Sequence, residues 1–580
     1  MDGAAGGAQK SDDGGATSCT QSRAGTAPRE KERWGSAGAV LIACLMTLPF
    51  LVFLFGGREH ATSVFRQSSS AMLTAMGGGV FKTSQASTSR ASATNADELL
   101  GGLLTAAGFD RGSCRSRYQS SQYYKYSPYA PSSYLQHKLR EYEARHRKCA
   151  PGTPLYAKST EQLRSGRSTE AMECNYLVWL PFEGLGNRML SLLSTFVYAL
   201  LTGRVVLVHS PRAADDFAGL FCEPFPNTTW VLPPDFPVAN LSRLGWSPDQ
   251  AYRNLLAKRK IANDPAKAKA TDDVGSVPPY VFVNVAHEHR FMDTLFFCSN
   301  DQGVLARVNW LLVYSDLYFV PSLYAVPAFR VELRRLFPAK ESAAHLLARY
   351  LFHPSNSVWG MVTRYYHSYL AQATRRVGVQ IRMFRFASIA VDDMYGQILA
   401  CSKQEHVLPE IDGGDGEART GNNLSRNTTA ILIASLYADY YERIRSRYYE
   451  HAARGGERIG VFQPSHEERQ ATGKPAHDQK ALAEIYLLSF SDELVTSGMS
   501  TFGYVSSSLA GLRPAMLLPA HGHRVPKTPC VRAVSMEPCN LKPPRAACKG
   551  GDPVDKDGED DLARHVKACE DERTGIKLFD

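Results

Sequence analysis

The sequence predicts an α/β protein in which helices pack on parallel strands, and three observations support this fold class. Strand-like and helix-like apolar segments alternate between residues 174 and 516, a pattern typical of α/β layers. The chain has 580 residues, of which 44% are hydrophobic, so it can fill at least two cores. Residues 176–208 also read as a strand, a glycine turn, a helix and a second strand.

The N-terminal region is expected to anchor the chain in a membrane. Residues 36–55 carry no charge, and about 20 apolar residues suffice to cross a bilayer core. More basic residues precede this segment than follow it: Arg23, Arg29, Lys31 and Arg33 before, Arg58 and Arg66 after. Because positive charge stays in the cytosol, we expect a cytosolic tail at 1–35, a transmembrane anchor at 36–55 and a flexible luminal stem at 56–113. A cleaved signal peptide is the alternative.

The cysteines and glycosylation motifs beyond the anchor indicate an oxidising, luminal compartment. The cysteines on that side are Cys114, Cys149, Cys174, Cys222, Cys298, Cys401, Cys530, Cys539, Cys548 and Cys569. Their number is even and no Cys-x-x-Cys pair occurs, so disulfides fit better than zinc, with the pairing left open. Glycosylation motifs begin at Asn227, Asn240, Asn423 and Asn427.

Three observations argue against other classes of site. The net charge of +9 comes from dispersed residues without a Lys/Arg block, which suits an anionic ligand but indicates no nucleic-acid partner. The segment AHEHRFMD at 286–293 holds two histidines, but no third ligand lies at a recognisable spacing, so it is interpreted as a polar loop. No Asp-x-Asp ends an apolar strand, and we therefore expect no metal site.

The glycine turn FEGLGNR is the first candidate site. Gly184 and Gly186 allow tight backbone geometry, and the N–H groups at the start of the following helix would then face a ligand. Asn187 and Arg188 would supply further donors to an anion or a polar group. The alternative is that both glycines are only structural.

A second turn, GMSTFGY at 498–504, follows a short predicted strand. Ser500 or Thr501 occupies the expected helix N-cap, and hydroxyls with backbone amides at that position could hold phosphate without a Walker lysine. The alternative is an ordinary N-cap.

The strand VGVQIRMF at 377–384 places Gln380 and Arg382 on one face, two residues apart. An arginine in an apolar strand is costly unless it is paired, and its fork matches pyrophosphate oxygens. A buried salt bridge to an acid is an equal alternative.

Many long motifs occur together in one order, including FEGLGNRML, LFFCSNDQ, SDLYFVPSL, LFHPSNSVWGMVTRYYHSYL, GVQIRMF, QPSHEERQ, MSTFGYV and SMEPC. From about residue 174 to 548 the chain resembles the plant xyloglucan fucosyltransferase family (galactoside 2-α-L-fucosyltransferases), which are Golgi type II membrane proteins. The resemblance implies a GT-B-like fold with two Rossmann-like domains facing a cleft. We expect an acceptor-side domain at 114–370, a GDP-fucose-binding domain at 371–548 and a charged tail at 549–580.

The resemblance also implies an activity: inverting, metal-independent transfer of L-fucose from GDP-fucose to a glycan, without a cofactor. The implied acceptors are terminal galactose of xyloglucan, giving an α-1,2 linkage, and arabinogalactan protein sugars. The alternative is an inactive luminal glycan-binding or complex-forming partner of another transferase. A homodimer or a complex with other Golgi transferases stays open.

The resemblance also implies a role for each residue that matches a family motif. Arg382 would grip the pyrophosphate, and Asp316 of SDLYFVPSL would lie near the acceptor as its base or its orienting group. The remaining residues implied in donor binding are Gly184, Gly186, Asn187, Arg188, Gln380, Ser500, Thr501 and Phe502.

Overall fold

The structure is a computed structural model that describes residues 98–166, 172–210, 216–245, 247–261, 278–412, 427–544, 548 and 564–580. The predicted transmembrane segment and most of the predicted stem lie outside these residues. Within the described part of the chain, no helix combines the length and the apolar character needed to span a membrane.

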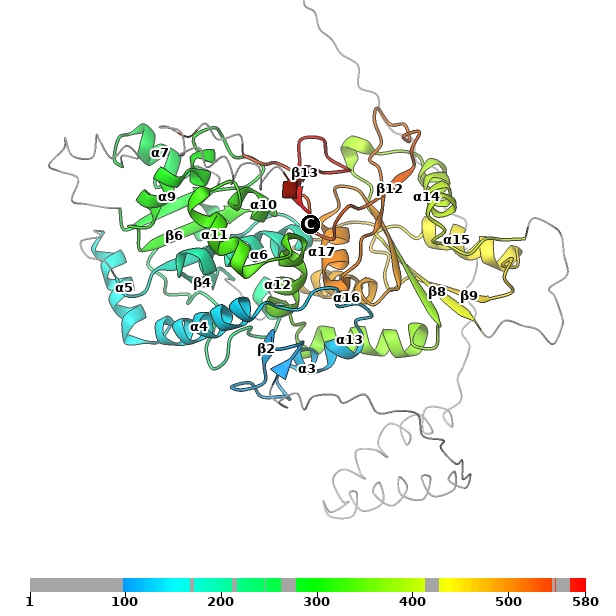
Figure 1. Cartoon of the computed structure of the whole chain (residues 1–580), viewed down its shortest axis with the longest axis horizontal. Helices are drawn as coiled ribbons and strands as arrows, with labels where there is room; N and C mark the ends of the chain where they lie inside the picture. Colours follow the sequence, from blue (N-terminus) through cyan, green and yellow to red (C-terminus); the bar gives the residue numbers. More distant parts are fainter. Residues whose placement is uncertain are drawn as a thin grey trace, which may run out of the picture. The chain divides into compact units, whose positions relative to one another are not determined.

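The first lobe is built on a sheet of four parallel strands in the order β4-β3-β6-β5 (Figure 1). The strands are β3 (Tyr176–Pro181), β4 (Val205–Val208), β5 (Tyr280–Asn284) and β6 (Trp310–Ser315). The helices are α4 (Ser133–Cys149), α5 (Pro154–Ser165), α6 (Leu185–Thr202), α7 (Tyr252–Ala257), α9 (Ser299–Leu305), α10 (Val320–Leu323), α11 (Pro327–Leu336) and α12 (Ala343–Leu351). Alternate strand residues face opposite sides, so Leu177 and Trp179 join the α6 core while Tyr176 and Val178 pack toward α5.

The second lobe is built on a six-stranded sheet in the order β12-β11-β10-β7-β8-β9, in which only β12 is antiparallel. Its strands are β7 (Arg375–Ile381), β8 (Thr428–Ser435), β9 (Arg458–Phe462), β10 (Glu493–Ser497), β11 (Ala515–Leu517) and β12 (Cys530–Arg532). Its helices are α14 (Val391–Glu405), α15 (Asp439–Glu450), α16 (Pro475–Ser489) and α17 (Thr501–Ala510). The prediction of an α/β protein with two Rossmann-like sheets is confirmed.

The two lobes share one hydrophobic core. Helix α17 packs on α6 and α12 as well as on α16, and a single cluster of buried side chains runs from Leu193 of α6 to Leu509 of α17 and Leu482 of α16. Because apolar packing continues across the junction, the two lobes are joined by more than the connecting chain.

The folded region extends beyond the predicted domain limits. Strands β1 (Glu98–Leu99) and β2 (Leu104–Thr105) pair within the predicted stem, and helix α3 (Arg115–Gln119) follows them. Helix α13 (Asn356–Tyr365) precedes the predicted boundary at 370 but packs on α16 of the second lobe. Within the predicted tail, β13 (Val566–Ala568) and β14 (Ile576–Leu578) form a hairpin. Buried Leu104 and Leu578 explain both additions, since each supplies an apolar anchor in a polar segment.

The structure pairs all ten cysteines of the predicted luminal region. The disulfides are Cys114–Cys222, Cys149–Cys174, Cys298–Cys548, Cys401–Cys530 and Cys539–Cys569. The prediction of an oxidised framework is therefore confirmed.

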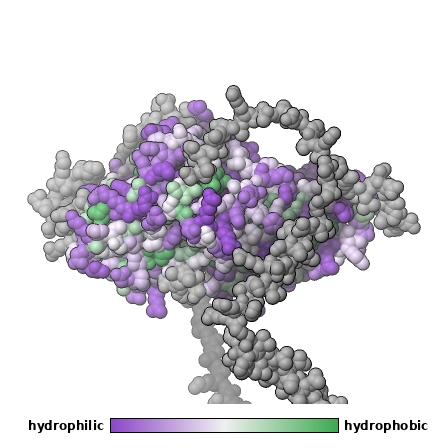
Figure 2. All heavy atoms as spheres, turned by 90° about the horizontal axis from the view of Figure 1, so that it is seen from below, coloured by the Kyte–Doolittle hydropathy of each residue, from purple (hydrophilic) through white to green (hydrophobic). Residues whose placement is uncertain are grey.

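The described surface is polar where glycosylation is expected. Asn227, Asn240 and Asn427 are exposed, whereas Asn423 lies outside the described residues. Figure 2 shows one face of the molecule, on which hydrophilic side chains predominate and apolar ones form small patches.

Candidate active site

The central strands of both sheets end in turns that carry predicted site residues. The second sheet reverses its strand order between β7 and β10, and in the first sheet β3 and β6 are the two central strands. In open parallel sheets, ligands bind at the carboxyl ends of the strands at such a switch point. The glycine turn follows β3, Asp316 follows β6, Arg382 follows β7 and the Ser500 turn follows β10.

A cavity of about 550 Å³ lies between these strand ends, a volume suited to a nucleotide-sized ligand. Almost every predicted site residue lines it: Gly184, Gly186, Asn187, Asp316, Gln380, Arg382, Ser500, Thr501 and Phe502. Arg188 is the exception.

Gly186 allows the two lobes to approach closely. A Cβ at this position would lie 2.7 Å from Thr501 Oγ1 and 2.9 Å from the Phe502 backbone nitrogen, distances that no real side chain tolerates. A Cβ on Gly184 would approach Gln470 Nε2 at 3.0 Å. Gly186 therefore allows α6 and α17 to pack closely. Because glycine has no side chain, it also determines the width of the cavity at this point.

Asn187 links the two lobes by hydrogen bonds. Its Nδ2 donates to the Asp316 carbonyl oxygen at 3.1 Å, and its Oδ1 accepts from Thr501 Oγ1 at 2.9 Å. The amide therefore fixes the end of β6 relative to the start of α17.

Arg188 lies beside Asp478 and does not line the cavity, contrary to the expectation that it would face the ligand. Its guanidinium is 3.8 Å from Asp478 Oδ2, with 12% of the side chain exposed. Burial raises the pKa of Asp478, and hydrogen bonding to the Gly473 amide and the charge of Arg188 oppose that rise. The arginine turned inward because the first turn of α16 offers this acid, which sits 290 residues away in sequence.

Arg382 faces the cavity without an acidic partner in the described part of the chain. Its guanidinium donates to the side-chain oxygen of Gln470 at 2.8 Å, and its backbone N–H donates to Ser497 Oγ at 2.9 Å. Burial lowers the pKa of Arg382. The buried salt bridge considered as the alternative is therefore not the arrangement found. Gln380 accepts from the Ser497 amide at 3.3 Å and holds the ends of β7 and β10 together.

The start of α17 presents uncapped backbone amides. Ser500 is the N-cap residue, yet its side chain makes no capping hydrogen bond. The first N–H groups of a helix have no partner within the helix and carry partial positive charge. Since Thr501 and Phe502 line the cavity, this end of the helix can hold an anion.

The turns on either side of the cavity both hold a non-glycine residue with positive φ. Glu183 adopts 61° and Met499 adopts 60°. Such backbone strain is typical of functional sites. The second turn is held by the C-terminal segment: the Met499 amide donates to Asp571 Oδ2 at 2.6 Å.

Asp316 is paired with His287, a residue that the sequence reading assigned to a polar loop. His287 follows β5, which neighbours β6, and its Nδ1 lies 2.5 Å from Asp316 Oδ2. Asp316 is 3% exposed, whereas the His287 ring lines the cavity. The signal in the sequence was a histidine just after an apolar strand, but its partner depends on which strands are neighbours.

Glu484 of α16 is a buried acid in the cavity wall. Its Oε1 accepts from Ser465 Oγ at 2.5 Å, and burial raises its pKa to about 8. A raised pKa means that the folded state holds the proton more tightly than the unfolded state. The protonated Glu484 side chain therefore contributes fully to the stability of the fold below its usual pKa of 4.5, and this contribution is lost as the pH rises toward 8.

Replacing Glu484 by glutamine should therefore flatten the fall in stability between pH 5 and 8. A difference of one bound proton between the folded and unfolded states changes the unfolding free energy by about 1.4 kcal/mol per pH unit. The melting temperature of the variant, relative to that of the wild type, should therefore rise with each increase in pH. Glu450→Gln, an exposed change at the end of α15, is the control. Parallel curves for Glu484→Gln and the wild type would contradict a raised pKa.

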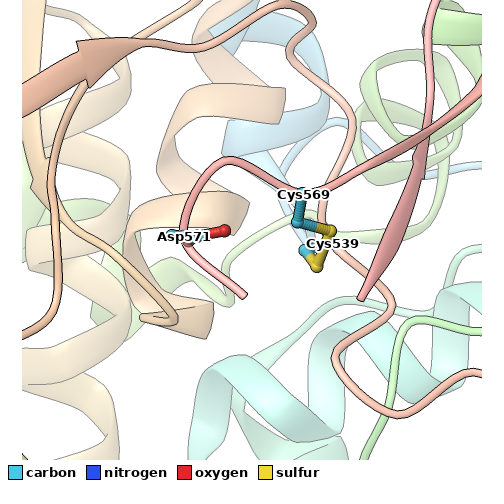
Figure 3. A group of neighbouring side chains, drawn as sticks. All are labelled: Cys539, Cys569 and Asp571. Carbon is cyan, nitrogen blue, oxygen red and sulfur yellow. A yellow bond between two sulfur atoms is a disulfide. The ribbon is translucent and has the colours of Figure 1, made fainter. Parts of the chain in front are cut away.

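One cluster with metal-ligand residue types lies beside the cavity, and its chemistry excludes a metal site. Cys539, Cys569 and Asp571 lie close together (Figure 3). The two sulfurs are joined in a disulfide, so neither is a thiolate ligand. Asp571 accepts hydrogen bonds from Met499 N and the Tyr504 hydroxyl, and thus anchors the C-terminal segment to the turn before α17.

Two sheets whose strand ends share one cavity, with an arginine and the start of a helix on one wall, define a two-lobed α/β enzyme for an anionic nucleotide ligand. The sequence model for xyloglucan fucosyltransferase matches residues 71–549, and the chain belongs to this family. It is a fucosyltransferase, an enzyme of the glycosyltransferase class.

Individual relatives agree with this assignment. The chain is 45% identical over 497 residues to "Probable fucosyltransferase 8" of Arabidopsis thaliana, covering 85% of this chain and 93% of that protein. It is 44% identical over 486 residues to the galactoside 2-α-L-fucosyltransferase of Pisum sativum, covering 83% and 82%. The structure is similar to a variant of Arabidopsis thaliana FUT1 in complex with GDP, with a TM-score of 0.72, 43% identity, and coverage of 83% of this chain and all of that one.

Proposed function

We propose that this fucosyltransferase moves L-fucose from GDP-fucose to a terminal galactose, or a similar sugar, of a plant cell-wall glycan. Xyloglucan and arabinogalactan protein glycans are the acceptor classes, and α-1,2 is the linkage. The transfer inverts the anomeric centre and needs no metal ion.

The observation that carries the proposal is the wall of the cavity around Arg382. Its guanidinium has only the amide of Gln470 as a side-chain hydrogen-bond partner among the described residues, and the uncapped start of α17 lies on the same cavity. A diphosphate would satisfy both. The related FUT1 structure binds GDP, which supports a guanosine diphosphate at this site.

The proposed role of this wall is to stabilise the leaving group. When the bond between fucose and the diphosphate breaks, negative charge grows on GDP and positive charge on the sugar. Arg382 and the amides near Ser500 are already in place for that charge, and one such donor is typically worth about 3 kcal/mol. The positive charge that the protein itself supplies supports the proposal that the leaving group departs without a metal ion.

The acceptor glycan is proposed to bind in the open groove next to the cavity. This groove, of about 470 Å³, shares His287 and Lys542 with the cavity and is also lined by His289, Arg290, Phe291, Thr294, Pro543 and Thr574. Phe291 is 59% exposed, and an exposed aromatic ring offers an apolar face on which a sugar ring can stack. The groove meets the cavity at His287, where the acceptor hydroxyl would face the fucose.

The proposed location is the Golgi lumen, with the chain held by the predicted anchor at 36–55 as a single-pass type II protein. Five disulfides support an oxidising compartment.

The test of the proposed function incubates the purified luminal region with labelled GDP-fucose and a panel of plant wall glycans. Label is expected in xyloglucan or arabinogalactan protein acceptors, and linkage analysis of the product identifies the acceptor position. Absence of transfer to every glycan of the panel would contradict the proposal.

GDP binding is a separate prediction that needs no acceptor. At a hundred times its dissociation constant, GDP should stabilise the folded protein by about 2.7 kcal/mol, which thermal melting detects as a higher melting temperature. AMP at the same concentration is the control nucleotide. An unchanged melting temperature at millimolar GDP would contradict a donor site in the cavity.

A further inference from the structure

Both carboxylate oxygens of Asp316 are engaged by His287. Its Oδ1 accepts the His287 backbone N–H at 2.9 Å, and its Oδ2 lies 2.5 Å from His287 Nδ1. With only 3% of the residue exposed, the carboxylate sits behind the histidine. A general base must reach the proton that it removes; Asp316 borders the cavity, but its buried carboxylate is turned toward His287.

His287, unlike the Asp316 carboxylate, is accessible from the cavity and the groove. Its side chain is 41% exposed, and it lines both the cavity and the groove. Phe182 stacks on the ring at 5.9 Å between centroids, with 10° between planes. The ring is therefore held in place from two directions.

The hydrogen bond to Asp316 selects the tautomer of His287. A carboxylate accepts, so Nδ1 carries the proton and the lone pair lies on Nε2. Within the described residues, no side chain or backbone group is found in a hydrogen bond with Nε2. This nitrogen is thus available at the junction of cavity and groove.

We infer that His287 is the general base of the fucosyl transfer and that Asp316 is its positioning residue. The inference rests on the proposed function and deepens it. As the acceptor oxygen bonds to C1 of fucose, its proton passes to His287 Nε2. The bond between C1 and the β-phosphate oxygen breaks at the same centre, and its electron pair leaves with GDP. A carboxylate behind the imidazole stabilises the imidazolium that forms, as in other acid–histidine pairs.

The charges around His287 set the direction of its pH dependence. The hydrogen bond that His287 donates to Asp316 raises the pKa of His287, burial opposes this rise, and the carboxylate charges of Asp316, Glu288 and Glu183 raise the pKa further. His289, Arg290 and Lys542 are the basic groups that line the groove with it. A base with a raised pKa is protonated at low pH, so the transfer rate should fall as the pH drops through that pKa and level off above it.

His287→Gln tests the assignment directly. Loss of a positioned base typically costs about a hundredfold or more in rate, so kcat for transfer should fall by that factor and the acid limb of its pH profile should disappear. The GDP-induced rise in melting temperature should remain, because the donor site is intact. His451→Gln, an exposed change after α15, should match the wild type.

Asp316→Asn provides the second measurement, which does not depend on the folding of His287→Gln. Removing the negative charge lowers the pKa of His287, so the acid limb should move to lower pH while kcat falls. An acid limb at the same pH in Asp316→Asn and the wild type would overturn the inference, as would kcat within threefold of wild type for His287→Gln. Failure of the wild type to transfer fucose at all would instead contradict the proposed function.

Discussion

Arg382→Lys is expected to cut turnover tenfold or more. Lysine keeps the charge but loses the planar fork that matches two phosphate oxygens at once. It also loses the hydrogen bond that now runs from the guanidinium to Gln470 at 2.8 Å. Because tenfold in rate corresponds to about 1.4 kcal/mol, the loss of one good charge-assisted hydrogen bond in the transition state accounts for the effect.

The measurement is the initial rate with labelled GDP-fucose at saturating acceptor, together with thermal melting to show that the variant is folded. Arg445→Lys is the matched control because Arg445 is exposed on α15 and its ion pair is with nearby Glu442 at the surface. Activity within twofold of the wild type would remove Arg382 from the site.

The donor wall of the cavity was predictable because its geometry is local. Gln380 and Arg382 follow from strand periodicity, and Ser500 and Thr501 from a turn that ends a strand and starts a helix. Parallel strands bring their carboxyl ends to one edge, and the resemblance to the xyloglucan fucosyltransferase family assigned these residues to one donor site. The same reasoning placed Gly184 and Asn187 at the equivalent edge of the first sheet.

The contacts between distant segments were not predictable because they depend on neighbours that sequence spacing does not reveal. Asp316 and His287 meet only because β5 lies next to β6. Arg188 pairs with Asp478 because α16 approaches α6. A motif assigns residue types to a turn, but the packing of the lobes decides which of them face the ligand.

The C-terminal segment is the clearest case in which composition was misleading. Charged residues predict a solvated tail, yet Asp571 binds the turn before α17 and Glu572 lines the cavity. The disulfide between Cys539 and Cys569 holds this segment in place. The buried Asp571 and one disulfide keep this segment attached to the fold despite its many charged residues. No local pattern in the sequence distinguishes such a buried acid from a solvated one.

Gly186→Ala should weaken both the fold and donor binding, although it adds a single methyl group. That methyl would lie 2.7 Å from Thr501 Oγ1 and 2.8 Å from the Thr501 backbone carbon. A side-chain hydroxyl can rotate away but helix backbone cannot, so α6 and α17 must separate. Overpacking of this kind costs about 1–3 kcal/mol of unfolding free energy. It would also stretch the hydrogen bond from Thr501 to Asn187, now 2.9 Å.

Donor binding should suffer because the amides at the start of α17 move with the helix. We expect GDP affinity to fall about tenfold, or about 1.4 kcal/mol, measured by titration calorimetry. Gly396→Ala is the matched control: Gly396 lies in helix α14, with nothing within 4 Å of an added Cβ, and alanine there should leave the fold as stable or more so. A Gly186→Ala protein with wild-type melting temperature and GDP affinity would mean that α6 and α17 move apart freely. In that case the shape of the cavity would be determined by the bound donor and not by the packing between the lobes.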